Sequence, residues 1–141
     1  MKPKLLVIDD HKGIRTQMKW ALGESYQVLL AENRLTGLEL FREHEPQVVL
    51  LDLGLPPQVN NPVEGFAALA DMLKLNRLAK IIIITGQGDR DSASRAIVAG
   101  AQDYLNKPIQ IDELKVILKR TFHIAELERS YRAGQAPENA A

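Results

Sequence analysis

Five short apolar runs, separated by longer amphipathic segments, constrain the fold of this chain more than any other feature. The runs lie at residues 5–8, 28–31, 48–51, 81–84 and, more weakly, 103–105. Uninterrupted apolar runs of this length predict strands that are buried on both faces. In each interval between two runs, apolar residues recur about every 3.6 positions, which predicts one amphipathic helix per interval.

The helical segments complete a strict alternation of strands and helices. Their apolar residues are Ile14, Met18, Ala21 and Leu22, then Leu35, Leu38 and Phe41, then Phe66, Leu69, Ala70 and Leu73, and then Ala93, Ala96 and Ile97. A fifth helix is expected after Pro108, with Asp112 in its first turn and Leu114, Ile117 and Leu118 on its inner face. Five strand-helix units predict an α/β doubly wound sandwich with a five-stranded parallel sheet and helices on both faces.

Composition and charge narrow the class of protein. The 141 residues are 45% hydrophobic and 26% charged, which suits one domain with a sizeable core. Eighteen Lys and Arg residues balance eighteen Asp and Glu residues, whereas a nucleic-acid-binding domain carries a basic excess. We therefore expect no direct nucleic-acid binding by this chain.

Other features exclude further kinds of site. The chain has no cysteine, and its three histidines, His11, His44 and His123, lack metal-ligand spacing. We interpret these histidines as surface or partly buried structural residues. The apolar runs are far shorter than the roughly 18 residues of a membrane span, and the start of the chain lacks a signal-peptide core. We therefore expect a cytoplasmic protein without membrane association.

Polar residues end the predicted strands. Asp9 and Asp10 follow the first run, Asp52 the third and Thr85 the fourth, and Lys107 follows the weaker fifth run. Each residue alone could cap a helix or be solvated. Capping does not explain three acids at the ends of two strands that should be central neighbours, with a cation nearby. Ligands of parallel α/β sheets bind at this edge, so we expect a site there.

The residue types indicate phosphoryl chemistry. Adjacent carboxylates repel one another unless a cation compensates them, and Mg²⁺ prefers carboxylate or carbonyl oxygens, waters and a phosphate. Asp52 follows an unbroken apolar run, and a carboxylate in such a rigid position can attack phosphorus to form an acyl phosphate. Lys107 would neutralise the phosphoryl oxygens, and Thr85 would donate a hydrogen bond to one of them.

These strand-end residues resemble the receiver domain of two-component response regulators. The resemblance rests on Asp9-Asp10, Asp52, Thr85-Gly86 and Lys107-Pro108 in this order, and it covers about residues 3–122. Because several positions must agree in order and spacing, the pattern is specific. The resemblance implies a flavodoxin-like sandwich of five strand-helix units with the strand order 2-1-3-4-5.

The resemblance also implies roles for the acidic residues. Asp52 would be the phosphoacceptor, which receives its phosphoryl group from a histidine kinase. Asp10 and Asp52, with the backbone carbonyl of Gly54, would hold Mg²⁺, and Asp9 would complete the acidic pocket. The chain would then be a signalling domain, with no catalysis beyond its own phosphorylation and dephosphorylation.

A conformational switch is the further implication of the resemblance. Thr85 would move toward the phosphoryl group, and Tyr104 matches the switch aromatic of the family, although its position also suits an ordinary half-buried strand aromatic. A phosphoryl group adds about −2 charge, which can reorder nearby loops. The face formed by the fourth helix, the fifth strand and the fifth helix should respond.

A long loop and three short motifs refine the resemblance. Residues 53–62 exceed the usual loop of about two to six residues after a strand, and they form either a stiff surface turn or a specificity element. Residues 4–10, 17–20 and 51–57 resemble receivers of PEP-CTERM-box response regulators, which are similar to sigma-54-activator-type transcription factors. The chain has no Gly-rich phosphate loop, so we expect an excised or stand-alone receiver that regulates transcription in the full-length protein.

The last predicted helix continues beyond the length that a receiver needs. Its apolar positions at spacings of seven, three and four are Ile117, Ile124, Leu127 and Tyr131. This pattern suits either a coiled-coil seam or an amphipathic terminal helix. We expect a receiver over residues 1–122, an extended helix over 123–133 and a disordered tail over 134–141. A homodimer could form through the last helix or through the switch face.

Three other functions compete with a phosphorylatable switch. One is a phosphate-independent interaction module, which would not need all of the strand-end side chains. Another is an aspartate-nucleophile phosphatase, but that class typically has a second Asp two residues after the nucleophile, where this chain has Gly54. A flavin-binding module would need a Ser/Thr/Gly-rich loop after the first strand, whereas Asp9 and Asp10 would repel a phosphate there.

Overall fold

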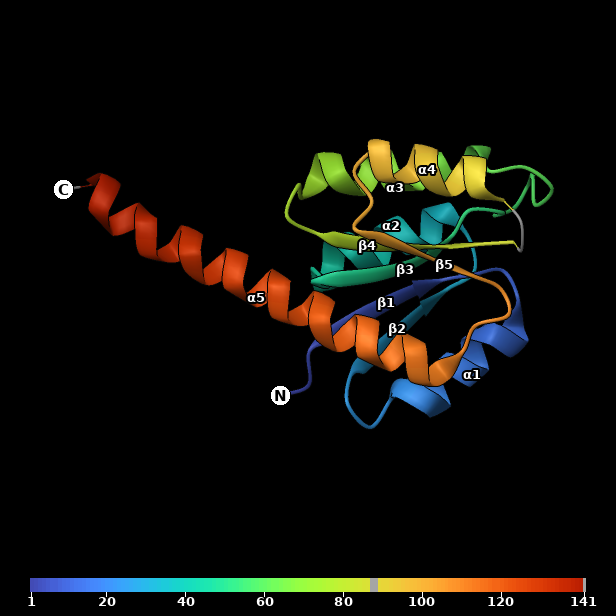
Figure 1. Cartoon of the computed structure of the whole chain (residues 1–141), viewed down its shortest axis with the longest axis horizontal. Helices are drawn as coiled ribbons and strands as arrows, with labels where there is room; N and C mark the ends of the chain where they lie inside the picture. The colour runs from blue at the N-terminus through green and yellow to red at the C-terminus, as the bar shows by residue number, and fades with distance from the viewer. Residues whose placement is uncertain (87–88, 141) are drawn as a thin grey trace.

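The computed structural model describes residues 1–86 and 89–140, with side chains up to residue 134. Within these residues, strands and helices alternate along the whole chain (Figure 1). The elements are β1 (Lys4–Ile8), α1 (Lys12–Leu22), β2 (Gln27–Ala31), α2 (Arg34–His44), β3 (Val48–Asp52), α3 (Val63–Leu75), β4 (Lys80–Thr85), α4 (Arg90–Val98), β5 (Asp103–Asn106) and α5 (Ile111–Ala140). All neighbouring strands are parallel, in the order β2-β1-β3-β4-β5. The predicted fold and strand order are confirmed.

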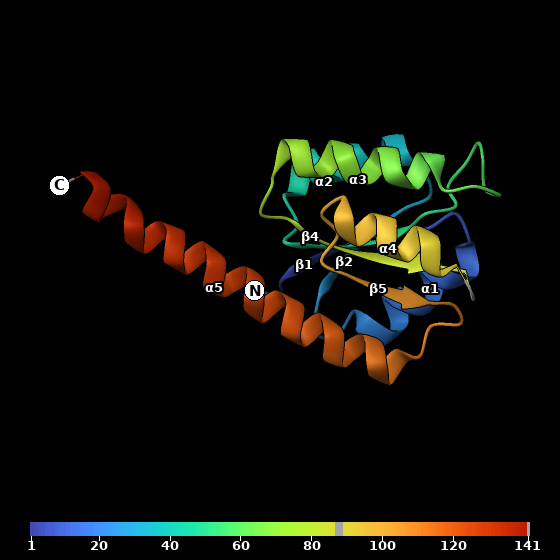
Figure 2. The same ribbon diagram turned by 45° about the horizontal axis from the view of Figure 1, so that its top comes forward.

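Helices cover both faces of the sheet (Figures 1 and 2). Successive residues of a strand point to opposite faces, so Leu6 and Ile8 pack with α2, α3 and α4, whereas Leu5 and Val7 pack with α1 and α5. The strand β3 is buried along its whole length. This burial on both faces explains why the strands are continuous apolar runs instead of alternating ones.

The register brings the strand ends to one edge of the sheet. Ile8 of β1 pairs with Leu51 of β3, and Asp52 pairs with Ile84 of β4. The residue after β1 and the last residues of β3 and β4 therefore lie beside one another.

Close packing fixes the chain directly after β3. Gly65, in the first turns of α3, donates a backbone hydrogen bond of 3.1 Å to the carbonyl oxygen of Leu53. A Cβ atom at Gly65 would lie 2.5 Å from that same oxygen. The helix α3 thus reaches the backbone beside Asp52 only because residue 65 has no side chain.

The helix α5 combines a docked part with a part that extends away from the sheet (Figures 1 and 2). Leu114, Leu118 and Phe122 are buried, and Lys80 Nζ at the start of β4 lies 2.7 Å from Glu128 Oε2. Leu127, one residue before Glu128, and Tyr131 after it are exposed, so part of the apolar pattern of the last helix stays on the surface.

The end of α5 differs from the sequence-based expectation. The helix continues to Ala140, through a segment where the sequence predicts a disordered tail. Helical backbone needs only its own hydrogen bonds, so the absence of an apolar period in 134–140 does not by itself exclude a helix. The division at residues 122 and 133 stays a prediction.

Among the described residues, no helix is both long enough and apolar enough to cross a membrane.

Candidate functional site

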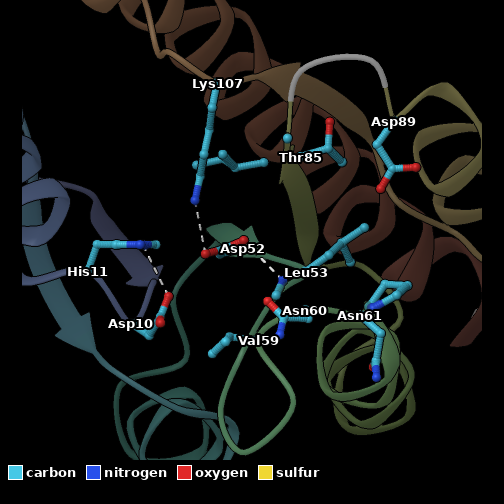
Figure 3. A pocket seen from close by; sticks show the side chains of 14 residues that line it. Asp10, His11, Asp52, Leu53, Val59, Asn60, Asn61, Thr85, Asp89 and Lys107 are labelled. Atoms are coloured by element: carbon cyan, nitrogen blue, oxygen red, sulfur yellow. Dashed lines mark hydrogen bonds and ion pairs between the residues drawn. The ribbon is translucent and has the colours of Figure 1, made fainter.

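A pocket of about 390 Å³ lies at the carboxyl edge of the sheet (Figure 3). Asp10, Asp52, Thr85 and Lys107, which follow or end four different strands, line it together with the loop over residues 59–62. The expected convergence of these side chains is therefore present in the structure.

Asp52 is a buried carboxylate with two partners. Its Oδ1 accepts a hydrogen bond of 3.0 Å from the backbone amide of Gly54, and its Oδ2 accepts one of 3.2 Å from Lys107 Nζ. Burial raises the pKa of Asp52, and the negative charge of Asp9 raises it further. The Lys107 charge and the Gly54 hydrogen bond act in the opposite direction on this pKa. The site thus concentrates negative charge, and the ammonium of Lys107 compensates it in part.

The remaining acids leave oxygen atoms without hydrogen bonds. Asp9 has no exposed surface; its Oδ1 accepts from the backbone amide of His11 at 2.9 Å, and its Oδ2 lies 3.9 Å from Lys107 Nζ. Asp9 Oδ2 and Asp10 Oδ1 are buried and have no hydrogen-bond donor among the described residues. Leaving charged oxygens in this state is costly, and a dication with oxygen ligands would remove that cost.

These acids can share one metal ion. Ligand atoms from Asp9, Asp10, His11 and Asp52 all lie within 4.8 Å of one another. The donor set contains three carboxylates, which suits Mg²⁺. Together with the two orphaned oxygens, this donor set fits the ion that the sequence predicts. The backbone amide of Gly54 points to Asp52, as the hydrogen bond above requires.

The two predicted switch residues occupy different environments. Thr85 ends β4, is buried, lines the pocket, and donates a hydrogen bond of 3.0 Å from Oγ1 to Asn106 Oδ1. Tyr104 lies on β5 opposite Ile83, is 40% exposed, and is not among the residues that line the pocket. The structure therefore brings Thr85 into the same pocket as Asp52 but places Tyr104 on the outer surface of the sheet edge.

His11 is nearer to the acids than the sequence pattern predicts. Its Nδ1 atom lies 3.2 Å from Asp9 Oδ1 and 3.2 Å from Asp10 Oδ1, and its side chain is 61% exposed. In Figure 3 the ring points toward the centre of the pocket. The sequence feature that could have indicated this proximity is that His11 directly follows the two acids at the end of the first apolar run.

The long loop after Asp52 forms one wall of the pocket. Val59, Asn60, Asn61 and Pro62 line it (Figure 3). Asn61 Oδ1 accepts a hydrogen bond of 3.0 Å from the amide of Val63 at the start of α3. The loop is thus joined to the helix that follows it, and it contributes side chains to the pocket.

Comparison with protein families identifies the class. Residues 5–119 match the response regulator receiver domain. The match covers most of the chain and includes every strand-end residue described above. The chain belongs to this family, whose members are the receiver domains of two-component systems.

Individual relatives agree with this assignment. The chain is 28% identical over 130 residues to the regulatory protein AtoC of Escherichia coli, covering 92% of this chain and 27% of AtoC. It is 31% identical over 121 residues to the sporulation initiation phosphotransferase F of Bacillus subtilis, covering 85% of this chain and 94% of that protein. The crystal structure of NtrX from Brucella abortus in complex with ADP is similar with a TM-score of 0.84 at 27% identity, over 93% of this chain and 29% of NtrX. The chain thus spans about a quarter of the length of AtoC.

Proposed function

We propose that this chain is a phosphorylatable receiver that accepts a phosphoryl group on Asp52 from a histidine kinase. The observation that supports this proposal is the position of the Asp52 carboxylate. It lies at an open pocket, with Gly54 holding one oxygen and Lys107 contacting the other. The name of the related sporulation initiation phosphotransferase F agrees with phosphoryl transfer.

In the proposed reaction Asp52 acts as the nucleophile. A carboxylate oxygen of Asp52 attacks the phosphorus atom of a phosphohistidine, and an O–P bond forms while the P–N bond breaks. The electron pair of the broken bond stays on the imidazole of the kinase, which takes up a proton. Lys107, whose Nζ is 3.2 Å from Asp52 Oδ2, would then pair with the new phosphoryl oxygens.

The residues that would hold Mg²⁺ are Asp10, Asp52 and the backbone carbonyl of Gly54, with Asp9 beside them. When bound, the ion would offset the negative charges that meet as the phosphoryl group approaches the carboxylates. The orphaned buried oxygens of Asp9 and Asp10 support this assignment.

The output would come from Thr85 and from the α4-β5-α5 face. Thr85 Oγ1 now donates to Asn106 Oδ1, and a phosphoryl oxygen on Asp52 would compete for that proton. We propose that the resulting movement reaches Tyr104, two residues before Asn106 on β5, and changes the surface offered to partners. A second copy of the chain, bound through this face or through α5, is one such partner.

The role in the whole protein is a further part of the proposal. The matched part of AtoC is about a quarter of that regulatory protein. We propose that this receiver likewise controls transcription from within a longer protein or through a separate partner, without contacting nucleic acid itself. The balanced charge of the chain supports the last point.

The test of the proposed function is intact-mass measurement after incubation with acetyl phosphate and Mg²⁺. We expect a gain of one phosphate, labile to hydroxylamine as an acyl phosphate is. Chelation of the metal with EDTA should prevent the gain, because the acidic pocket then repels the anionic donor. Failure to gain phosphate from several donors, including a phosphorylated histidine kinase, would support the phosphate-independent interaction module instead.

Replacing Lys107 with Gln should slow phosphate incorporation on the order of tenfold or more, because a charge-assisted contact to the phosphoryl oxygens is lost. Lys115→Gln is the matched control, since this lysine is exposed on α5 and does not line the pocket. Rates from a mass time course would check the prediction. Equal rates for the Lys107 variant and the control would remove Lys107 from the reaction.

A further inference from the structure

His11 occupies a position at the start of α1 where its side chain has no helix-capping role. It is the residue before the first turn of α1, yet its side chain makes no capping hydrogen bond. Residues selected for capping are usually Ser, Thr, Asp or Asn, whose oxygens accept from the helix amides. The ring is turned instead toward the acids, with Nδ1 3.2 Å from both Asp9 Oδ1 and Asp10 Oδ1.

A second, independent observation indicates that a ligand is needed at this point. Asp9 is completely buried, and its Oδ2 has no hydrogen-bond donor among the described residues. Asp10 Oδ1 is in the same condition and lies directly beside the His11 ring. An imidazole nitrogen and carboxylate oxygens that converge in this way form a mixed nitrogen and oxygen donor set.

We propose that His11 Nδ1 is a direct ligand of transition-metal ions in this pocket, so that the site binds ions that prefer imidazole, such as Ni²⁺, in addition to Mg²⁺. Carboxylate and carbonyl oxygens suit Mg²⁺ and Mn²⁺, whereas imidazole favours Cu²⁺, Ni²⁺ and Zn²⁺. The inference rests on the cation site of the proposed function but not on phosphorylation of Asp52. The exposed part of the ring leaves it free to adjust to an ion.

The competing role for His11 is that of a hydrogen-bond donor. In that case Nδ1–H would donate to the carboxylates of Asp9 or Asp10 and position them without touching the ion. The two roles can be distinguished by electron paramagnetic resonance. A ligand gives a nitrogen hyperfine coupling to a paramagnetic ion, and a hydrogen-bond donor outside the coordination sphere does not give the coupling of a directly bonded nitrogen.

The first experiment measures metal affinity by calorimetry on the metal-free full chain. We expect His11→Gln to weaken Ni²⁺ binding on the order of tenfold or more while Mg²⁺ affinity changes by less than about twofold, because only Ni²⁺ strongly prefers imidazole. His123→Gln is the matched control, since His123 is an exposed histidine on α5. Equal losses of Ni²⁺ affinity in both variants, or none in the His11 variant, would overturn the proposal.

The second experiment observes the bond itself. Pulsed electron paramagnetic resonance of the Cu²⁺-loaded chain should show a directly bonded nitrogen that disappears in His11→Gln and remains in His123→Gln. A wild-type spectrum without this coupling contradicts the inference. Intact-mass phosphorylation in Mg²⁺ is measured on the same samples. Normal phosphorylation without the coupling refutes the His11 ligand alone, and the coupling without phosphorylation refutes the proposed function alone.

Discussion

Replacing Asp52 with Asn is expected to reduce phosphate incorporation from one group per chain to background. The carboxamide has nearly the shape of the carboxylate but lacks a nucleophilic oxygen that can form an acyl phosphate. Its single oxygen can still accept one of the two hydrogen bonds that Gly54 and Lys107 now donate to the two carboxylate oxygens. The result would therefore report the loss of the nucleophile and not the loss of the pocket, and intact mass with acetyl phosphate and Mg²⁺ measures it.

The matched control is Asp89→Asn. Asp89 also lines the pocket, but its carboxylate accepts a hydrogen bond of 3.2 Å from the amide of Ser92 and caps α4. Asparagine caps helices as well as aspartate does, so this variant should fold and take up phosphate like the wild type. Full phosphorylation of Asp52→Asn, or the same loss in both variants, would contradict the assignment of Asp52.

Stability against pH gives an independent check that Asp52→Asn is folded. Burial and the Asp9 charge raise the pKa of Asp52 in the folded chain. The folded state therefore holds this proton more tightly than the unfolded state, and the wild type loses stability as pH rises from the ordinary aspartate pKa through the raised one. Without metal, the variant should resist urea better than the wild type at neutral pH. The difference should vanish at acidic pH, where Asp52 is protonated.

The sequence predicts the fold well because the strands are buried on both faces. Leu5 and Leu6 point to opposite sides of the sheet, and each meets its own helical layer. Because both faces of the strand are buried, the residues on both faces are apolar, and the sequence shows an uninterrupted apolar run. The strand order follows from the resemblance to receivers and not from the apolar pattern, since the same alternation fits other doubly wound orders.

The site is predictable to the extent that backbone position determines it. Parallel strands end at one edge, so Asp52 and Lys107 meet even though 55 residues separate them. The orientations of side chains and the conformations of loops depend on local packing, which the apolar pattern of the sequence does not predict. The turn of the His11 ring toward the acids, the Thr85 contact with Asn106 and the wall formed by residues 59–62 are of this kind.

Gly65→Ala should destabilise the chain by about 2 kcal/mol or more, because the added methyl group meets backbone that has no room to move. The new Cβ would lie 2.5 Å from the carbonyl oxygen and 2.7 Å from the carbonyl carbon of Leu53. The gain in helix propensity from Gly to Ala, about 1 kcal/mol, is too small to offset such an overlap. A lower urea midpoint with an unchanged slope, followed by circular dichroism, would show the loss.

Gly13→Ala separates this effect from the general preference of helices for alanine. Gly13 lies in α1, and a Cβ atom there would meet nothing within 4 Å. Its replacement should leave stability unchanged or raise it by up to about 1 kcal/mol. Equal behaviour of the two variants would mean that α3 can move away from Leu53 at little cost. A loss confined to Gly65→Ala, accompanied by slower phosphate uptake, would instead show that the contact between α3 and Leu53 holds the proposed phosphoacceptor in position, since Leu53 directly follows Asp52.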